Sequence, residues 1–250
     1  MKKLLIFMLM AMPFVFTSCS NDDKGSSDDI KIQKSKIELI SGETEQIVAT
    51  SDLVLSYTSE DEYFASVDNS GVVAAKRVGE TNILIKNAKT EAKVSVIVSP
   101  KYTTYPDPNL MFGETRESVI KKLGTPTSET SDAIAYEDYS TKAPIIMYAF
   151  DGNTTNSKVN GVNVIVRTTY SEELAAYLAE RYFMVGGSGD ITLVGLNNID
   201  PKKATLSVAL SLYNLNYWMV MYMPYASSTY SIYDNFNIDQ KKVKISKLLK

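Results

Sequence analysis

The chain has 250 residues, with 26 basic and 29 acidic side chains, a formal net charge of −3, no histidine and one cysteine. Without histidine it cannot build a Ser-His or Cys-His nucleophilic pair or a histidine zinc site. Carboxylate chemistry stays open, because a glycosidase needs only two Asp or Glu side chains. The charge balance lacks the strongly basic face that nucleic-acid binding requires. We therefore expect no nucleic-acid partner, no metal, no cofactor and no enzymatic activity.

Residues 1–18 are predicted to be a targeting segment. Lys2 and Lys3 precede an almost wholly apolar run at positions 4–16. A run of this length suits a signal-peptide core and is shorter than the roughly 20 apolar residues that a membrane-spanning helix needs. Thr17 and Ser18 then lead to Cys19, the single cysteine of the chain.

This arrangement resembles the lipobox of bacterial lipoproteins. The resemblance implies that signal peptidase cuts before Cys19 and that Cys19 carries lipid, which makes the membrane a partner through a lipid anchor. Phe16 stands where that motif usually has Leu. The alternative is an ordinary signal peptide followed by an unpaired thiol.

Residues 19–29 are predicted to form an acidic linker after the lipidated cysteine. Asn21, Asp22 and Asp23 resemble the surface-export signal of Bacteroidota lipoproteins, and Ser20 is not the Asp that holds lipoproteins in the inner membrane. The expected location is therefore the outer membrane, exposed at the cell surface. Loss of residues 1–18, which hold two lysines and no acid, would leave 24 basic and 29 acidic residues and a net charge of −5.

Residues 30–99 are predicted to form an all-β sandwich. Apolar and polar residues alternate in short segments such as 37–40, 82–86 and 94–98, and turn sequences separate them. Asp68-Asn69-Ser70-Gly71 is the strongest of these turn sequences. Gly71 and Gly79 are expected at turns, where glycine can adopt positive φ.

The same segment resembles bacterial Ig-like group 2 domains. The matching residues are Tyr57-Thr58-Ser59, Ala65-Ser66-Val67-Asp68, Gly71, Val73, Gly79, Thr81 and Ile83. Tyr57 stands where that family commonly has Trp. The resemblance implies a module of cell-surface proteins and adhesins, which acts either as a spacer or as a receptor-binding domain.

Residues 101–226 are predicted to form a two-layer α+β domain with an antiparallel sheet. Thr115 caps a helix that Gly124 ends, and strands follow at 133–139, 145–150 and 162–168, with turns at 151–153 and 160–161. Ser171 is expected to cap a second helix, followed by strands at 191–196, 204–213 and 217–223. The strand at 204–213 should bury one face and keep a small, polar one. The order of one helix and three strands therefore occurs twice, which indicates a tandem repeat.

The stretch 113–126 resembles one known helix motif. Its pattern Gly-x-Thr-x-x-x-Val-x-x-x-Leu-Gly-x-Pro is similar to that of the outer-membrane lipoprotein BamE and of β-lactamase-inhibitor-like folds. The resemblance implies a helix before an antiparallel sheet, and protein binding as a general role. The alternative is a helix whose pattern reflects only its capping residues and apolar stripe, without a relationship to that family.

The candidate binding residues are Trp218, Tyr222, Tyr136 and Glu137. In the segment 217–223 both faces are apolar, with Trp218 and Tyr222 on one of them. Either this strand is buried on both sides, which is the commoner situation, or Trp218 and Tyr222 form an exposed patch. Exposed aromatic rings beside carboxylates would suit sugar rings or a protein partner.

Two other segments are predicted to have no binding role. Gly186-Gly187-Ser188-Gly189 lacks the Lys-Ser/Thr of a phosphate-binding loop and is expected to be a flexible connector. The tail at 227–250 is rich in lysine, and is expected to be a solvated end, a short amphipathic helix or an added strand.

The sequence thus favours a lipid-anchored, non-catalytic binding or adhesion module for a protein or glycan. The alternative is an envelope assembly or inhibitor-like protein that faces the periplasm. A carboxylate glycosidase is the third hypothesis and has the least support.

Overall fold

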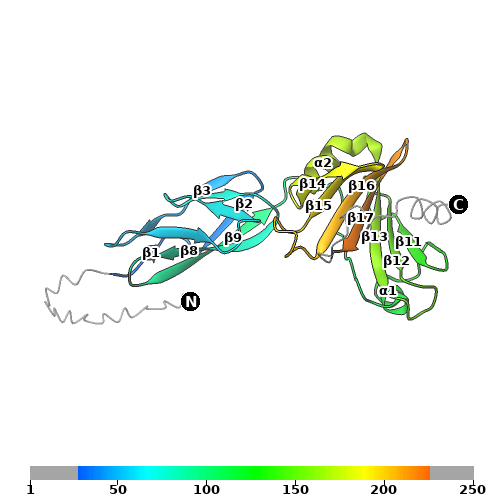
Figure 1. The fold of residues 1–250 in the computed structure, drawn as a ribbon, viewed down its shortest axis with the longest axis horizontal. Helices are drawn as coiled ribbons and strands as arrows, with labels where there is room; N and C mark the ends of the chain where they lie inside the picture. Colours follow the sequence, from blue (N-terminus) through cyan, green and yellow to red (C-terminus); the bar gives the residue numbers. More distant parts are fainter. Residues whose placement is uncertain (1–27, 226–250) are drawn as a thin grey trace, which may run out of the picture.

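The computed structural model describes residues 28–225, so the predicted signal segment at 1–18, Cys19 and the tail at 227–250 lie outside the described residues. The chain forms two domains that lie end to end, an all-β sandwich toward its N-terminal end and an α+β domain after it (Figure 1). Within residues 28–225, neither of the two α-helices is long and apolar enough to cross a membrane.

The sandwich is built from nine short strands in three sheets. A four-stranded sheet has the order β2-β9-β8-β5, a three-stranded sheet the order β3-β7-β6, and β1 pairs with β4. Their bounds are β1 Lys31–Ile32, β2 Lys36–Ile40, β3 Thr44–Gln46, β4 Ala49–Thr50, β5 Ser56–Ser59, β6 Ala65–Val67, β7 Val72–Ala75, β8 Gly79–Lys86 and β9 Glu91–Ser99. The predicted β-sandwich is therefore confirmed.

Alternation along these strands builds the core of the sandwich. Val94, Val96 and Val98 on β9 are buried, as are Ile83 and Ile85 on β8. Between β6 and β7, the Asp68 carboxylate accepts hydrogen bonds from the backbone N–H groups at positions 70 and 72, both at 2.9 Å. The Ser70 hydroxyl also donates to this carboxylate, at 2.7 Å, and its hydrogen bond, followed by those of the backbone, lowers the pKa of Asp68. These contacts tie the predicted turn together.

The second domain contains one continuous antiparallel sheet of eight strands. Its order is β10-β11-β12-β13-β17-β16-β15-β14, so the last strands of the two halves, β13 and β17, pair at the centre. The bounds are α1 Arg116–Leu123, β10 Ser128–Glu129, β11 Ala133–Glu137, β12 Ile145–Phe150, β13 Val159–Arg167, the 3-10 turn Thr168–Tyr170, α2 Ser171–Ala179, β14 Phe183–Ser188, β15 Ile191–Leu196, β16 Leu206–Asn214 and β17 Tyr217–Pro224. Each half has a helix and four strands, one strand more than the sequence indicated.

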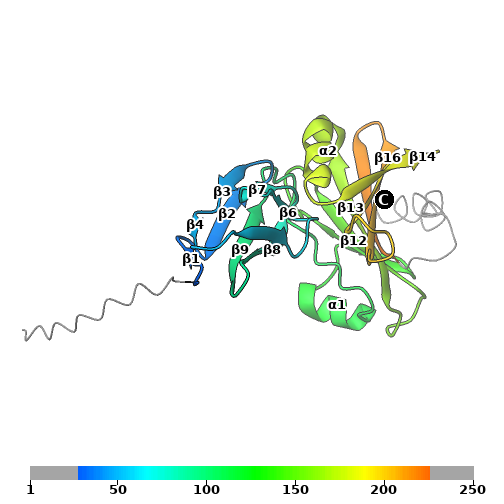
Figure 2. The ribbon, with the colours of Figure 1, turned by 60° about the vertical axis from the view of Figure 1, so that its left-hand side comes forward.

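Both helices cover the same face of this sheet, as Figure 2 shows. Val119 of α1 and Leu174, Tyr177 and Leu178 of α2 pack in one cluster with buried side chains of β13, β16 and β17. A second cluster of buried side chains lies on the opposite face and comes only from strands of the sheet. The helix at 116–123 begins as predicted, since the Thr115 hydroxyl accepts a hydrogen bond from the Ser118 N–H.

Three local predictions were wrong. Gly186, Gly187 and Ser188 belong to β14 and not to a connector; a Cβ on Gly187 would lie 2.4 Å from the Thr192 carbonyl oxygen, so glycine is needed for that close approach. Positions 160–161 lie inside β13, because the turn after β12 is longer than expected. Ser171 does not cap α2, since its hydroxyl donates backward to the Thr168 carbonyl oxygen at 2.5 Å.

The small, polar face predicted for the strand at 204–213 is also buried. Ser207, Ala209 and Ser211 are fully buried in the structure. The Ser211 hydroxyl donates to the Asp190 carbonyl oxygen at 2.8 Å, which satisfies its polar group without water.

Candidate binding surfaces

The candidate residues Trp218 and Tyr222 on β17 do not form an exposed patch. Tyr222 is 0 % exposed, and its hydroxyl lies 2.7 Å from that of Tyr105, with which it shares a hydrogen bond. Burial raises the pKa of both phenols well above the ordinary value. Trp218 is half-buried and its indole N–H donates to the Ser171 hydroxyl at the start of α2, at 2.7 Å. Burial on both sides, the alternative that the sequence left open, is therefore confirmed for Tyr222.

Tyr136 and Glu137 lie elsewhere, at the end of β11. Tyr136 is half-buried, and its hydroxyl donates to the Gly124 carbonyl oxygen just after α1, at 3.0 Å. Burial raises the pKa of this phenol. Glu137 is exposed. In the sheet, β11 is three strands away from β17, roughly 14 Å at the usual strand spacing, so the four predicted residues do not form one site.

The two domains meet in a joint that the sequence did not indicate. The Tyr63 hydroxyl, from the loop before β6, donates to the carbonyl oxygens of Arg181 at 2.6 Å and Leu196 at 3.1 Å. Burial raises the pKa of Tyr63 to about 12. The Val78 N–H donates to the Glu180 carbonyl oxygen at 2.8 Å, and the Arg77 guanidinium lies over the Tyr63 and Phe183 rings.

The buried charges of Glu180 and Arg181 fasten the segment between β9 and α1, which we call the interdomain linker, to this joint. The Glu180 carboxylate accepts the backbone N–H groups of Lys101 and Tyr102, each at 3.0 Å, and a hydrogen bond from Arg181 at 2.6 Å. Arg181 also donates to Asp107 at 2.8 Å, and its guanidinium carbon lies 3.7 Å from the centre of the Tyr177 ring. Burial acts to lower the pKa of Arg181, but its hydrogen bond to Asp107 and the neighbouring charges raise it on balance. The two buried charges of the joint, Glu180 and Arg181, are therefore paired with each other and further hydrogen-bonded, which makes their burial tolerable.

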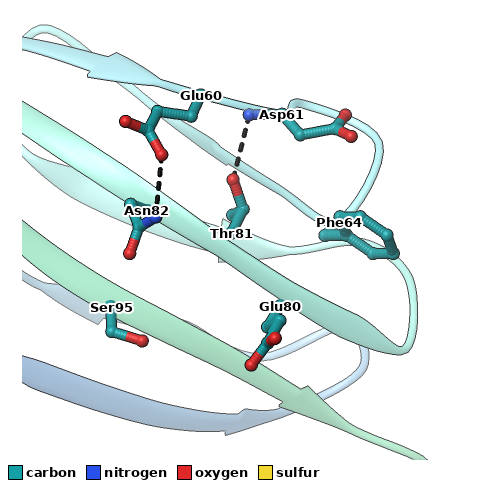
Figure 3. Close-up of a pocket in the computed structure, with 7 residues that line it drawn as sticks. All are labelled: Glu60, Asp61, Phe64, Glu80, Thr81, Asn82 and Ser95. Atoms are coloured by element: carbon teal, nitrogen blue, oxygen red, sulfur yellow. Dashed lines mark hydrogen bonds between the residues drawn. The ribbon is translucent and has the colours of Figure 1, made fainter.

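Figure 3 shows a groove on the sandwich domain, with a cavity volume of about 380 Å³. It is lined by Glu60, Asp61, Phe64, Glu80, Thr81, Asn82 and Ser95. Glu60 already binds Lys93 and Asn82, each at 2.7 Å, and these hydrogen bonds lower its pKa. The Thr81 hydroxyl accepts the Asp61 N–H at 2.9 Å. These contacts join β5, β8 and β9, so most of the polar groups serve the fold of the domain.

Several carboxyl groups of the described residues have a clearly shifted pKa. A general acid needs a raised pKa. Within residues 28–225, every carboxyl group whose pKa clearly shifts has a lowered pKa, namely Glu38, Glu60, Asp68 and Glu114. The same range contains no group of three or more His, Cys, Asp or Glu side chains that could hold a metal ion.

Comparison with known proteins finds distant structural likeness only. No protein-family model matches the chain, and no curated protein matches it. Domains 4 and 5 of the S-layer protein SbsC are similar at 24% identity and a TM-score of 0.26, over 28% of this chain and 50% of that one. A mutant intimin of EHEC O157:H7 is similar at 17% identity and a TM-score of 0.26, over 41% of this chain and 61% of that one.

A third structure is a SusE-like surface located polysaccharide binding protein from the heparin utilisation locus of Bacteroides thetaiotaomicron. It is similar at 9% identity and a TM-score of 0.23, over 55% of this chain and 31% of that one. The chain thus spans less than two thirds of the length of each of these three proteins. These TM-scores are too low to carry an argument about what the chain binds.

Proposed function

We propose that this protein is a non-catalytic binding protein of the cell surface. In this proposal it is held at the outer membrane by lipid on Cys19, and it captures a protein or glycan with its α+β domain. The sandwich domain is the spacer between the membrane and the α+β domain. The observation that carries the proposal is the geometry of the spacer, which is fixed at both of its ends.

The N-terminal segment enters the sandwich at the end far from the joint. The Asp28 carbonyl oxygen accepts hydrogen bonds from Asn87 at 2.7 Å and Thr90 at 3.1 Å, in the turn between β8 and β9. The opposite end of β8, beside Val78, contacts the α+β domain. Because β8 has eight residues, it separates the two ends by about 25 Å. Figure 1 shows this end-to-end arrangement.

The surface best placed for a ligand is the edge of the sheet that lies away from the joint. Phe183 of β14 and Leu196 of β15 contact the sandwich, whereas β11 is five strands away from β15 in the sheet, roughly 24 Å. At this far edge, where the two-residue β10 is the last strand, the half-buried Tyr136 ring and the exposed Glu137 carboxylate at the end of β11 lie near the end of α1, where Leu123 is 41 % exposed. An aromatic ring, an aliphatic side chain and a carboxylate suit the contact with a sugar ring or a protein.

The first experiment tests the location. Intact cells are treated with protease and probed for the α+β domain. We expect the domain to be lost without lysis of the cells. Protection until the cells are opened would refute surface exposure and favour the envelope-assembly alternative.

The second experiment tests the far edge. The purified protein is screened for binding on a glycan array and on an array of secreted proteins. Binding to any ligand that is found is then compared between two double variants. Tyr136→Ala/Glu137→Gln should lose capture, while Tyr170→Ala/Glu172→Gln, a matched tyrosine and glutamate beside α2, should keep it. Equal capture by the two variants, with circular dichroism unchanged, would show that the far edge is not the site.

The second candidate function, envelope assembly, is favoured by α1. The helix that resembles BamE is present at Arg116–Leu123, with its cap at Thr115 and a C-terminal Gly124 at φ 88°. Site-specific crosslinking from positions 113–126 tests this candidate. Crosslinks to an outer-membrane assembly complex would favour it over ligand capture.

A further inference from the structure

Arg77 carries a guanidinium group that donates no hydrogen bond to the described part of the chain. It lies in the turn between β7 and β8, next to Val78 at the joint between the domains. The other three arginines, Arg116, Arg167 and Arg181, each donate from the side chain to a carbonyl or carboxylate oxygen. Within residues 28–225, the Arg77 side chain has neither such an acceptor nor an ion pair, and its contacts are with aromatic rings.

Burial makes this lack of acceptors costly. The Arg77 Nε is buried without a partner, whereas its two terminal nitrogens are not fully buried. A charged donor that is buried without an acceptor costs free energy, and native structures rarely leave one unless water or a ligand completes it. Arg116 also has a buried, unpaired Nε, but its Nη2 donates to the carbonyl oxygens of Thr130 and Ser131, at 2.8 and 2.9 Å. In Arg77 the whole fork of N–H donors is available.

Two aromatic rings, one from each domain, hold this guanidinium in place. Its carbon lies 4.9 Å from the centre of the Tyr63 ring and 5.4 Å from that of the Phe183 ring. The Tyr63 ring is fixed in turn, because its hydroxyl donates to the Arg181 and Leu196 carbonyl oxygens. The rings contribute cation–π attraction but accept no strong hydrogen bond from the N–H groups. The donors are therefore held in position and unused, which lowers the entropic cost of binding an anion.

The acidic side chains close to Arg77 in the chain and at the joint do not neutralise it. The Glu180 carboxylate already accepts three hydrogen bonds, from the interdomain linker and the end of α2. Asp61 accepts a backbone N–H of its own loop at 2.9 Å. The exposed Glu62 and Glu80 form no ion pair within residues 28–225. The described residues therefore leave the guanidinium charge to an external anion.

We propose that Arg77 binds one oxyanion group, a carboxylate, sulfate or phosphate, of a ligand that docks at the joint. The guanidinium presents Nε–H and a terminal N–H side by side, and this fork pairs with two oxygens of such a group. Three lysines border the joint: Lys76 precedes Arg77, and Lys202 and Lys203 lie in the loop after β15, whose last residue Leu196 contacts the sandwich. All three are exposed and form no ion pair within residues 28–225, so their charge adds to the attraction.

This site is distinct from the far edge proposed for ligand capture, and it does not depend on that proposal. The guanidinium lies over one ring from the sandwich and one from the α+β domain, so an anion bound to it lies where the two domains meet. A ligand that binds only the folded protein raises its stability by mass action. Occupation of Arg77 should therefore raise the melting temperature of the chain.

NMR of the arginine side chains tests the proposal on the full chain. The chain has four arginines, so ¹⁵N labelling of arginine gives at most four Nε–H signals, and Arg77→Lys identifies the signal of residue 77 by its loss. Acetate, sulfate and phosphate are titrated separately, with chloride at matched ionic strength as the control. We expect the Arg77 signal to shift saturably with at least one oxyanion, at roughly millimolar concentration, while the Arg116 signal stays in place. Tightest binding of acetate indicates a carboxylate ligand, and tightest binding of sulfate or phosphate indicates a sulfated or phosphorylated one.

Two variants define what the guanidinium contributes. In the parent chain the melting temperature should rise by about 3–5 °C at ten times the half-saturating anion concentration. Arg77→Lys keeps the charge but loses the fork of donors, so this rise should disappear, whereas Lys76→Met, the matched control, should keep it. No saturable shift of the Arg77 signal, or an undiminished rise in Arg77→Lys, would overturn the proposal. An equal shift with chloride would mark an adventitious ion only, and would also overturn it.

Discussion

Replacing Glu180 by Gln should weaken the joint between the domains more than its small change in shape suggests. The carboxylate accepts two backbone N–H groups, from Lys101 and Tyr102, and one hydrogen bond from Arg181. An amide offers only one acceptor oxygen, so its NH₂ group must face one of these donors. The side chain is 6 % exposed, and water therefore cannot replace the lost acceptor.

The expected cost follows from these contacts. One charge-assisted hydrogen bond is lost and one buried N–H is left unpaired, which together destabilise the fold by about 3 kcal/mol. For a protein of this size that corresponds to a fall in melting temperature of roughly 6–12 °C. Chemical unfolding by urea and calorimetry measure both quantities. Glu172→Gln, at an exposed position on α2, is the control and should change stability by less than about 0.5 kcal/mol.

Calorimetry also tests whether Glu180 couples the domains. The parent chain should unfold in one transition, with a ratio of van't Hoff to calorimetric enthalpy of about 1. In Glu180→Gln the ratio of the two enthalpies should fall below 1, because the interdomain linker at Lys101 and Tyr102 is released from the end of α2 and the two domains then unfold less cooperatively. A variant that stays within about 1 kcal/mol of the parent and keeps a single transition would refute the role that we assign to this carboxylate.

Three further predictions concern the fold. Gly79→Ala should destabilise the sandwich by about 1–3 kcal/mol, because φ is +143° at this residue and a Cβ there would lie 2.3 Å from the Phe64 ring. Gly42→Ala is the control; its Cβ would meet no atom within 4 Å, so it should lower the melting temperature less. The free energy of unfolding should fall as pH rises above about 10, because the buried phenols of Tyr105 and Tyr222 have raised pKa values and keep protons that the unfolded chain releases. Tyr105→Phe should make this fall with pH shallower. An unchanged dependence of the unfolding free energy on pH, measured by urea titrations, would contradict the role of Tyr105. Trp218, the one tryptophan, should emit at short wavelength in the folded protein and shift to the red on unfolding; acrylamide quenching as fast as that of free tryptophan would contradict its packing under α2.

Much of the sandwich follows from local pattern. Val94, Val96 and Val98 alternate with polar residues, and that period alone assigns them to one buried face. The strand β14 shows the limit of this reasoning. Its glycines disfavour a strand locally, but the close approach of Gly187 to the Thr192 carbonyl oxygen admits no other residue. Tertiary packing thus overrides the local preference of the segment.

The joint could not be predicted for a related reason. Glu180 and Arg181 follow the last residue of α2, where charged side chains are usually solvated. They are buried because Lys101, Tyr102 and Asp107 reach them from more than 70 positions earlier in the chain. No local pattern of residues reports such long-range contacts.

The burial of both sheet faces also limits where a ligand can bind. The sequence assigned Trp218 and Tyr222 to one face of β17 and the methionines to the other, but alternation cannot say which face meets water. Within residues 28–225, both faces of the sheet carry clusters of buried apolar side chains, one of them beneath the helices. Contacts with a partner must then be made by loops and edges, and the far edge at Tyr136 and Glu137 is the edge that the sandwich leaves uncovered.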